Sequence, residues 1–300
     1  MTRLADLADL VRAPAALSVP GDVLSGAAAA GALGRRTPAL AGASVLLYWA
    51  GMAANDWADR RLDAVERPER PIPSGRVRPS VALGVASGLT AAGLAVATAA
   101  GGRRAAAVAL PLAATIWGYD LRAKNTAAGP AVMAACRGLD VLLGASGGRV
   151  VRALPAALTV AAHTWTVTAL SRREVTGADR RLPGLTLTGT ALIALTTPAR
   201  PTPPAPGRAA RLGSGRAARL GDLVPAVLAA GYAARYGRAQ ARVLADPSPA
   251  RVRAAVGAGI TGLPALQGAL TARAGARLLG LAVAGAAPLG RRLARLISPT

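Results

Sequence analysis

The fold of this chain is indicated by one stretch of sequence, PALAGASVLLYWAGMAANDWADRRLD at residues 38–63, in which an apolar run ends in a cluster of carboxylates. Its first 18 residues carry no charged side chain, and Asp56, Asp59 and Asp63 then follow within eight positions. A helix needs roughly 17 to 25 predominantly apolar residues to cross a bilayer. The stretch therefore predicts a membrane-spanning helix over 38–56 with an acidic end at the membrane surface.

The composition of the whole chain extends this interpretation. Of its 300 residues 52% are hydrophobic and only 17% are charged, where a soluble domain carries about 25% charged residues. The abundance of Ala, Arg and Gly is typical of a GC-rich bacterial genome. Cys136 is the single cysteine, so an intrachain disulfide and a structural zinc site are both excluded. These numbers favour a multi-pass protein of a bacterial inner membrane.

Further apolar runs predict an all-α transmembrane bundle of nine or ten helices, forming a single domain over residues 1–300. The segment 199–221 is rich in Pro, Gly and Arg and is expected to be a flexible loop. The expected spans are 14–33, 38–56, 80–101, 104–120, 130–147, 154–171, 184–198, 222–237, 252–271 and 277–297.

The distribution of basic residues between alternate loops predicts the topology, because cytoplasmic loops are enriched in Lys and Arg. The formal charge is +22, and 19 basic residues fall at one end of the predicted bundle against 13 at the other. The richer end holds residues 1–12 and the loops 57–79, 121–129, 172–183 and 235–253. It is expected to face the cytoplasm. Dispersal of the arginines over both membrane faces excludes a nucleic-acid binder.

The carboxylates that end the second span share one helix face. Asn55, Asp56, Asp59 and Asp63 lie within about 100° of one another around a helix axis. Like charges at this spacing repel unless a cation lies between them, and oxygen ligands of this kind suit Mg²⁺. The alternative is a solvated helix end whose carboxylates pair with neighbouring arginines.

A proline-rich loop, RPERPIPSGRV at residues 67–77, follows the acidic face and is expected to return Arg70, Ser74 and Arg76 toward the carboxylates. Carboxylates that hold a metal, beside fixed guanidinium groups, are suited to binding a diphosphate.

These two motifs together resemble the first signature of the UbiA superfamily of intramembrane prenyltransferases. They are the run Asn55-Asp56-x-x-Asp59-x-x-x-Asp63 and the Arg-Pro-x-Pro-Ser-Gly turn at 70–75. The resemblance implies a bundle of about nine helices around a central cavity. It also implies Mg²⁺ on two Asp-rich motifs, an isoprenyl diphosphate bound to the metal, and a prenyl chain in a tunnel open to membrane lipid.

Other positions match the family less fully. Tyr119 to Lys124 resembles the Tyr-x-x-x-x-Lys segment, which implies diphosphate contacts for Tyr119, Arg122 and Lys124; the alternative is a lysine that snorkels from a helix end. Arg137 and Asp140 lie inside the fifth span, either as site residues or as a structural ion pair. The lone His163 is expected to be a hydrogen-bonded interior residue or a base.

The second motif departs from the family pattern. The loop after the sixth span has Glu174 and Asp179 where Asp-x-x-x-Asp is usual, which is similar to a divergent bacterial branch with a degenerate second motif. The resemblance assigns both residues to Mg²⁺.

The expected function is Mg²⁺-dependent transfer of an isoprenyl group from its diphosphate to an aromatic or other small lipophilic acceptor, with Asp140 or Asp120 as the base. The alternative is a non-catalytic membrane protein of the same fold that binds a prenyl lipid. A CDP-alcohol phosphotransferase is disfavoured because no Asp-Gly-x-x-Ala-Arg run follows Asp56.

Overall fold

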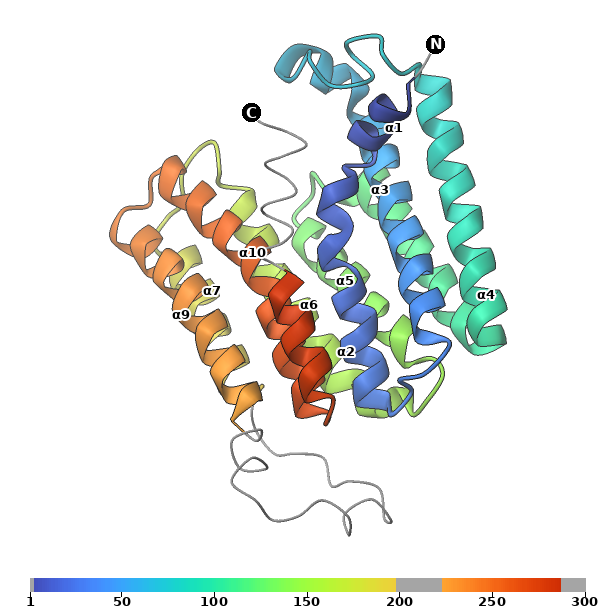
Figure 1. Ribbon diagram of the computed structural model, residues 1–300. Coiled ribbons are helices and arrows are strands. Elements are labelled where there is room, and N and C mark those ends of the chain that lie inside the picture. Colours follow the sequence, from blue (N-terminus) through green and yellow to red (C-terminus); the bar gives the residue numbers. More distant parts are fainter. Residues whose placement is uncertain (1–2, 198–222, 287–300) are drawn as a thin grey trace.

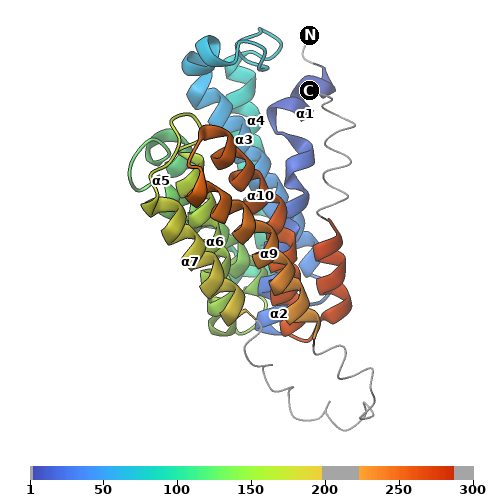
Figure 2. The same cartoon turned by 90° about the vertical axis from the view of Figure 1, so that its left-hand side faces the viewer.

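The computed structural model describes residues 3–197 and 223–286, and these residues form a bundle of helices without a strand (Figures 1 and 2). The expected loop 199–221 and the end of the expected span 277–297 lie outside the described residues. The helices are α1 (Leu4–Leu10), η1 (Ala13–Ser18), α2 (Pro20–Ala30), α3 (Thr37–Glu66), α4 (Pro79–Gly118), η2 (Tyr119–Ala123), α5 (Gly129–Ala145), α6 (Val150–Ser171), α7 (Arg181–Thr196), α9 (Val224–Ala245), α10 (Pro249–Arg273) and a short helix at Arg277–Ala286.

Helix α4 consists of two antiparallel arms. Gly102 has φ 63° and ψ −155°, a conformation open to glycine, and it interrupts the helix. Trp117 Nε1 donates to Thr90 Oγ1 at 3.1 Å, whereas 27 residues of straight helix would separate the two positions by about 40 Å. The expected spans 80–101 and 104–120 are therefore separate crossings joined by a very short turn.

Within the part of the chain that the structure describes, three helical segments are long and apolar enough to cross a membrane by length and composition alone. They are Thr37–Glu66, Pro79–Ala123 and Val150–Ser171. Helices α2, α5 and α7 have 11, 17 and 16 residues and are shorter, while α9 carries several arginines. These elements complete the bundle by packing against the longer helices.

Helices α2 and α5 pack with their backbones in contact. A Cβ atom at Gly26 would collide with the carbonyl oxygen of Val141, and one at Gly144 would collide with that of Val23. Small residues at helix interfaces allow this approach in membrane bundles, where close packing replaces the hydrophobic driving force of water. The two glycines thereby hold α5 and its polar side chains against the N-terminal helices.

The loops that sequence analysis assigned to one side of the membrane lie at one end of the bundle. Helix α1, the 67–78 loop and the α9–α10 turn lie at the upper end in Figure 1, and the bend of α4 and the α2–α3 turn lie at the lower end. The acidic end of α3 is therefore at the arginine-rich end.

Candidate active site

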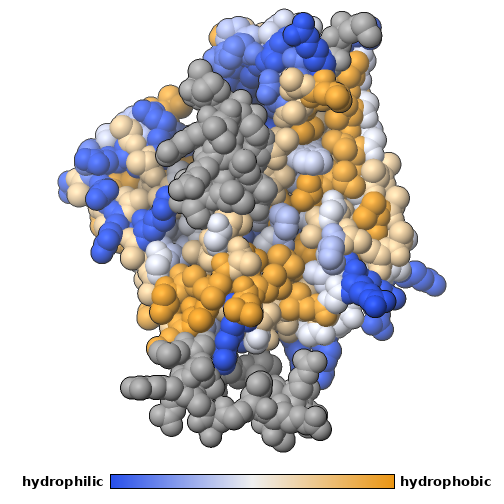
Figure 3. All heavy atoms as spheres, viewed as in Figure 1, coloured by the Kyte–Doolittle hydropathy of each residue, from blue (hydrophilic) through white to orange (hydrophobic). Residues whose placement is uncertain are grey.

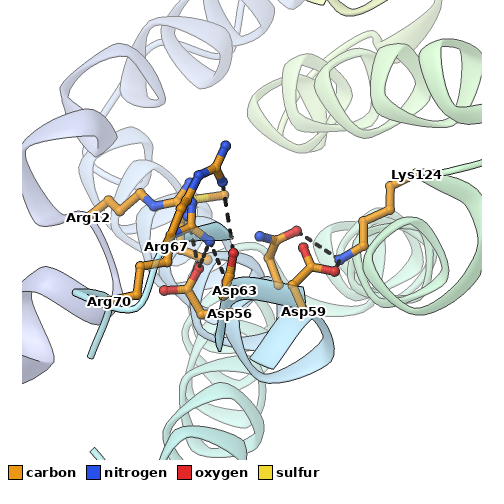
Figure 4. Close-up of polar contacts among 9 residues, drawn as sticks. Arg12, Asp56, Asp59, Asp63, Arg67, Arg70 and Lys124 are labelled. Atoms are coloured by element: carbon orange, nitrogen blue, oxygen red, sulfur yellow. Dashed lines mark hydrogen bonds and ion pairs between the residues drawn. The ribbon is translucent and has the colours of Figure 1, made fainter. Parts of the chain in front are cut away.

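Two carboxylates of α3 share one guanidinium group from the loop that follows the helix (Figure 4). Asp56 and Asp63 are 3% and 2% exposed. Arg70 Nη1 lies 2.6 Å from Asp63 Oδ2 and 3.3 Å from Asp56 Oδ1. The 67–78 loop makes this contact possible because Val77 N–H bonds to the Pro71 carbonyl and closes the turn. The structure thus brings Arg70 to the carboxylates, as the proline-rich loop predicted. The same prediction is wrong for Arg76, which pairs with Asp6 and Asp9 of α1 at 3.0 Å, and for Ser74, which bonds within its own loop.

Asp56 has a second cationic partner that sequence analysis missed. Arg12, between α1 and η1, places Nη2 2.8 Å from Asp56 Oδ1. Its backbone is left-handed, with φ 48°, which is uncommon for a residue other than glycine. Strained backbone of this kind clusters at functional sites. The only sequence signal was the topology, which placed Arg12 at the same membrane end as the acidic face.

The third carboxylate points in another direction. Lys124 Nζ lies 2.6 Å from Asp59 Oδ1 and donates to Asn55 Oδ1 at 3.2 Å. The lysine follows η2, a turn of π-helix that ends the second arm of α4. Tyr119 in this turn is half-buried and Arg122 is exposed. Figure 4 shows Asp59 and Lys124 on one side of α3 and Arg70 on the other.

The acidic face is thus neutralised by side chains of the chain itself, because Arg12, Arg70 and Lys124 meet the three carboxylates and Arg67 Nη1 lies 4.0 Å from Asp63 Oδ1. Within residues 3–197 and 223–286, no three His, Cys, Asp or Glu side chains converge to hold a metal ion. The physical reason is that Arg70 lies between Asp56 and Asp63 while Lys124 draws Asp59 away. The donors remain hard oxygen atoms, which is the chemistry that Mg²⁺ takes.

The second candidate motif lies on the loop between α6 and α7. Burial raises the pKa of the half-buried Glu174 carboxyl, while the guanidinium groups of Arg253 and Arg67 act in the opposite direction. Asp179 is exposed, and its Oδ1 accepts the backbone N–H of Leu182 at 3.0 Å, at the start of α7. The loop therefore holds Asp179 against the start of α7, while the Glu174 backbone carbonyl accepts Arg253 Nη1 of α10 at 2.7 Å.

The polar residues inside the bundle pair differently from the predicted arrangement. Arg137 Nε lies 2.8 Å from Asp22 Oδ2 on α2, and Asp140 accepts the Ser44 hydroxyl of α3 at 2.6 and 2.7 Å. Of the two alternatives for these residues, the structural Arg137–Asp140 ion pair is therefore not formed. Close packing of α5 against both helices gives each side chain a nearer partner on another helix.

His163 is a hydrogen-bonded interior residue, which was one of the two alternatives. Its Nδ1 lies 2.9 Å from the Tyr232 hydroxyl, and its ring meets Tyr232 and Tyr236 edge-on at centroid distances of 5.3 and 5.4 Å. The ring is 1% exposed. This cluster joins α6 to α9 and lies apart from the acidic face of α3.

Two cavities lie away from the acidic face. One, of about 620 Å³, is a groove between α9 and α10, and the other, of about 240 Å³, lies at the opposite end beside Arg35 and Gly147. Neither is lined by a carboxylate of α3. Neither corresponds to the central cavity that the family resemblance implies.

Comparison with known proteins identifies the family. The model of the UbiA prenyltransferase family matches residues 21–191. The digeranylgeranylglyceryl phosphate synthase of Methanothrix thermoacetophila is 51% identical over 63 residues, which are 20% of this chain and 24% of that protein. The bacteriochlorophyll synthase 33 kDa chain of Cereibacter sphaeroides is 46% identical over 54 residues, 18% of either protein. The aligned segments thus span about a quarter or less of these two relatives.

Solved structures show the same fold over most of the chain. A structure from work on digeranylgeranylglyceryl phosphate synthase in membranes superposes with a TM-score of 0.66, at 16% identity, over 91% of this chain and 99% of that one. The apo structure of a UbiA homolog from Aeropyrum pernix K1 gives a TM-score of 0.57 at 18% identity, over 82% and 96%. With its apolar helices and this fold, the chain is a membrane protein and belongs to the UbiA prenyltransferase family.

Proposed function

We propose that the protein transfers an isoprenyl group from an isoprenyl diphosphate to a lipophilic acceptor within the membrane. The observation that carries the proposal is the charged cluster on α3, where Arg12, Arg70 and Lys124 come from three different segments to meet three carboxylates. A cluster in which fixed cations already offset the carboxylates is suited to a ligand that is itself highly charged.

The three cations are the groups that would turn to the oxygens of the diphosphate. Guanidinium groups match phosphate oxygens with paired N–H donors, and the Lys124 ammonium adds a compact charge. The carboxylates that they release, Asp56, Asp59 and Asp63, are the groups that would hold Mg²⁺. Asn55 would add an amide oxygen to this set. Glu174, on the loop between α6 and α7, would contribute to a second ion, whereas Asp179 would first have to leave the start of α7.

Bound Mg²⁺ would neutralise the charge that develops on the diphosphate as the bond to the isoprenyl carbon breaks. Arg12, Arg70 and Lys124 would stabilise the same charge. The apolar surroundings of α3 and α4 would keep water from the allylic cation. Tyr119 and Arg122 lie on the η2 turn beside Lys124 and would border the diphosphate.

Distance separates the two candidate bases. Asp140 bonds to Ser44, which precedes Asp56 by 12 residues on α3, or about 18 Å along the helix. Asp120 is buried on η2, four residues before Lys124, which pairs with Asp59. We assign the acceptor proton to Asp120 and a structural role to Asp140. Arg137, paired with Asp22, then also serves the bundle rather than the diphosphate.

The cluster would face the cytoplasm of a bacterial cell, because it lies at the arginine-rich end of the bundle.

The test is prenyl transfer by the purified full-length protein in phosphatidylcholine liposomes. Radiolabelled geranylgeranyl or farnesyl diphosphate is supplied with Mg²⁺ and a panel of aromatic and glycerol-based lipophilic acceptors. Label is expected in an acceptor product with Mg²⁺ and not with EDTA. Asp56→Asn should lower transfer about 1,000-fold, whereas Asp246→Asn, which alters an exposed carboxylate at the end of α9, should leave transfer unchanged.

Two results would contradict the proposed prenyl transfer. Tight binding of the labelled diphosphate without product across the whole acceptor panel would support a non-catalytic prenyl-lipid-binding protein. Transfer that Asp56→Asn leaves intact would show that the chemistry lies elsewhere in the bundle.

A further inference from the structure

A groove between α9 and α10 presents four arginine side chains and no acidic residue in its lining. It has a volume of about 620 Å³. Arg235, Arg238 and Arg242 line it from α9 and Arg251 from α10, over a floor of small residues that includes Gly231 and Ala234. Small side chains on the floor leave the guanidinium groups as the walls.

The sequence of α9 places these arginines in one row. Arg235, Arg238 and Arg242 lie within about 60° around the helix axis, and all three are exposed. A neighbouring face of α9, about 100° further around the helix axis, is buried through Tyr232 and Tyr236. The row therefore lies on the outer surface of the bundle and extends about 10 Å along the helix.

The arginines of the groove lack sufficient counter-charge from the protein. Arg251 Nε lies 3.4 Å from Asp246 Oδ2, in a pair that is more than half exposed on both sides. Arg235 donates to the Thr261 hydroxyl at 3.0 Å. Neither Arg238 nor Arg242 forms an ion pair within the part of the chain that the structure describes. The groove thus retains a surplus of positive charge.

The surroundings of the groove suit a lipid rather than a soluble anion. Hydrophilic side chains gather over the upper part of α9 and α10 in Figure 3, and apolar side chains cover the surface below them. Val227, 65% exposed, continues the face of α9 below Gly231. Arginines that face hydrocarbon are costly unless a counter-ion is present, and basic pockets between membrane helices bind phosphate headgroups.

We propose that this groove binds the phosphate headgroup of an anionic membrane phospholipid, with acyl chains that run down α9 over Val227. The site is separate from the acidic face of α3, since α9 and α10 lie on one side of the bundle and α3 and α4 on the other (Figure 1). Its occupation does not depend on the reaction proposed above.

The test uses full-length protein in nanodiscs of phosphatidylcholine alone or mixed with an equal part of phosphatidylglycerol. Native mass spectrometry identifies the lipid that each protein retains. The wild type is expected to retain phosphatidylglycerol preferentially. Arg238→Gln combined with Arg242→Gln should lower that preference about 30-fold, since each arginine near an anionic surface contributes a factor of about five.

Matched variants separate this site from general charge effects. Arg103→Gln combined with Arg104→Gln removes the same charge from an exposed turn at the other end of the bundle and should leave the preference unchanged. Arg238→Lys combined with Arg242→Lys keeps the charge and should keep most of the preference. The glutamine variant should also transfer prenyl groups, or bind the diphosphate, as the wild type does.

Three outcomes would overturn the proposal. One is equal retention of both lipids by the wild type, and another is an equal loss in the Arg103 and Arg104 variant. The third is complete displacement of phosphatidylglycerol by inorganic phosphate, which would identify a site for a free anion instead.

Discussion

Two rows of charged side chains in this protein have the same sequence spacing and opposite surroundings. Asp56, Asp59 and Asp63 on α3 recur at i, i+3 and i+7, and so do the arginines at 235, 238 and 242 on α9. The first row is met by cations from the end of η2, where Lys124 follows the helix, from the 67–78 loop and from the α1–η1 junction. The second row remains exposed.

Helical spacing thus predicts that a helix has a charged face. It does not predict whether that face is neutralised inside the protein or by a partner outside it. A face that other elements of the chain neutralise can be buried and can fix the geometry of a reaction. A face without such partners needs counter-charge from outside the protein, and at a membrane surface this comes from lipid. Substitutions in the two rows should therefore differ in kind as well as in size.

The largest difference is expected in catalysis. Asp56→Asn keeps the size of the side chain and removes its charge, so prenyl transfer should fall about 1,000-fold, the usual cost of losing one electrostatic contact in a transition state. Arg238→Gln should leave the rate unchanged. Both rates are measured with radiolabelled diphosphate in phosphatidylcholine liposomes, and similar losses in the two variants would refute the distinction.

A smaller difference is expected in stability. Arg70→Ala leaves Asp63 without its nearest cation, while Asp56 keeps Arg12, so the free energy of unfolding should fall by about 2 to 3 kcal/mol. This is below the full cost of breaking a buried pair, because Arg70 is 18% exposed and partly screened.

The matched substitution for stability lies in the other row. Arg242→Ala should change the free energy of unfolding by less than about 0.5 kcal/mol. Titration with SDS in mixed micelles measures both variants. Added Mg²⁺ should restore part of the free energy of unfolding that Arg70→Ala loses. If Mg²⁺ does not change the stability of this variant, Asp56 and Asp63 are not metal ligands.

Next in size is the effect of Lys124, which pairs with the more exposed Asp59. Lys124→Met should lower kcat/KM for the diphosphate about 30-fold, at the lower end of what truncating one partner of a charge pair costs. Arg251→Met, which breaks the exposed pair with Asp246, serves as the control and should leave kcat/KM unchanged. If Lys124→Arg keeps most of the wild-type kcat/KM, the charge at position 124 rather than the shape of the side chain is what the diphosphate requires.

The smallest effect is expected beside the groove. Asp246→Asn removes the carboxylate that partly neutralises Arg251, so the preference for phosphatidylglycerol over phosphatidylcholine should rise about threefold or less. Native mass spectrometry of the retained lipids measures the change. A fall in the preference would mean that Asp246 itself orders the groove.

Several features of the fold could be predicted from the sequence because they depend on local composition. The expected spans 80–101 and 104–120 became the two arms of α4, since the glycines at 101 and 102 interrupt the apolar run where the chain must turn. The acidic face of α3 follows from helical periodicity alone. The loop after it returned Arg70 because its prolines and Gly75, with φ 75°, favour a tight turn.

Pairings between distant segments could not be predicted in the same way. Arg137 and Asp140 are three residues apart, and helical spacing allows them to pair. They separate because α2 and α3 each present a nearer polar group, Asp22 and Ser44. The contact between Arg12 and Asp56 could not be predicted either, because it joins distant segments and nothing in the local sequence of Arg12 indicates it.

By itself the sequence determined the helical class, the approximate spans, the end of the bundle that holds the carboxylates and the family signature. All of these depend on residues within a turn or two of one another, where periodicity and transfer to lipid decide the outcome. Only the tertiary structure decided which charges are neutralised inside the protein and which face the membrane. That choice depends on which side chains of other helices lie within a few ångströms, and sequence separation carries no information about such distances.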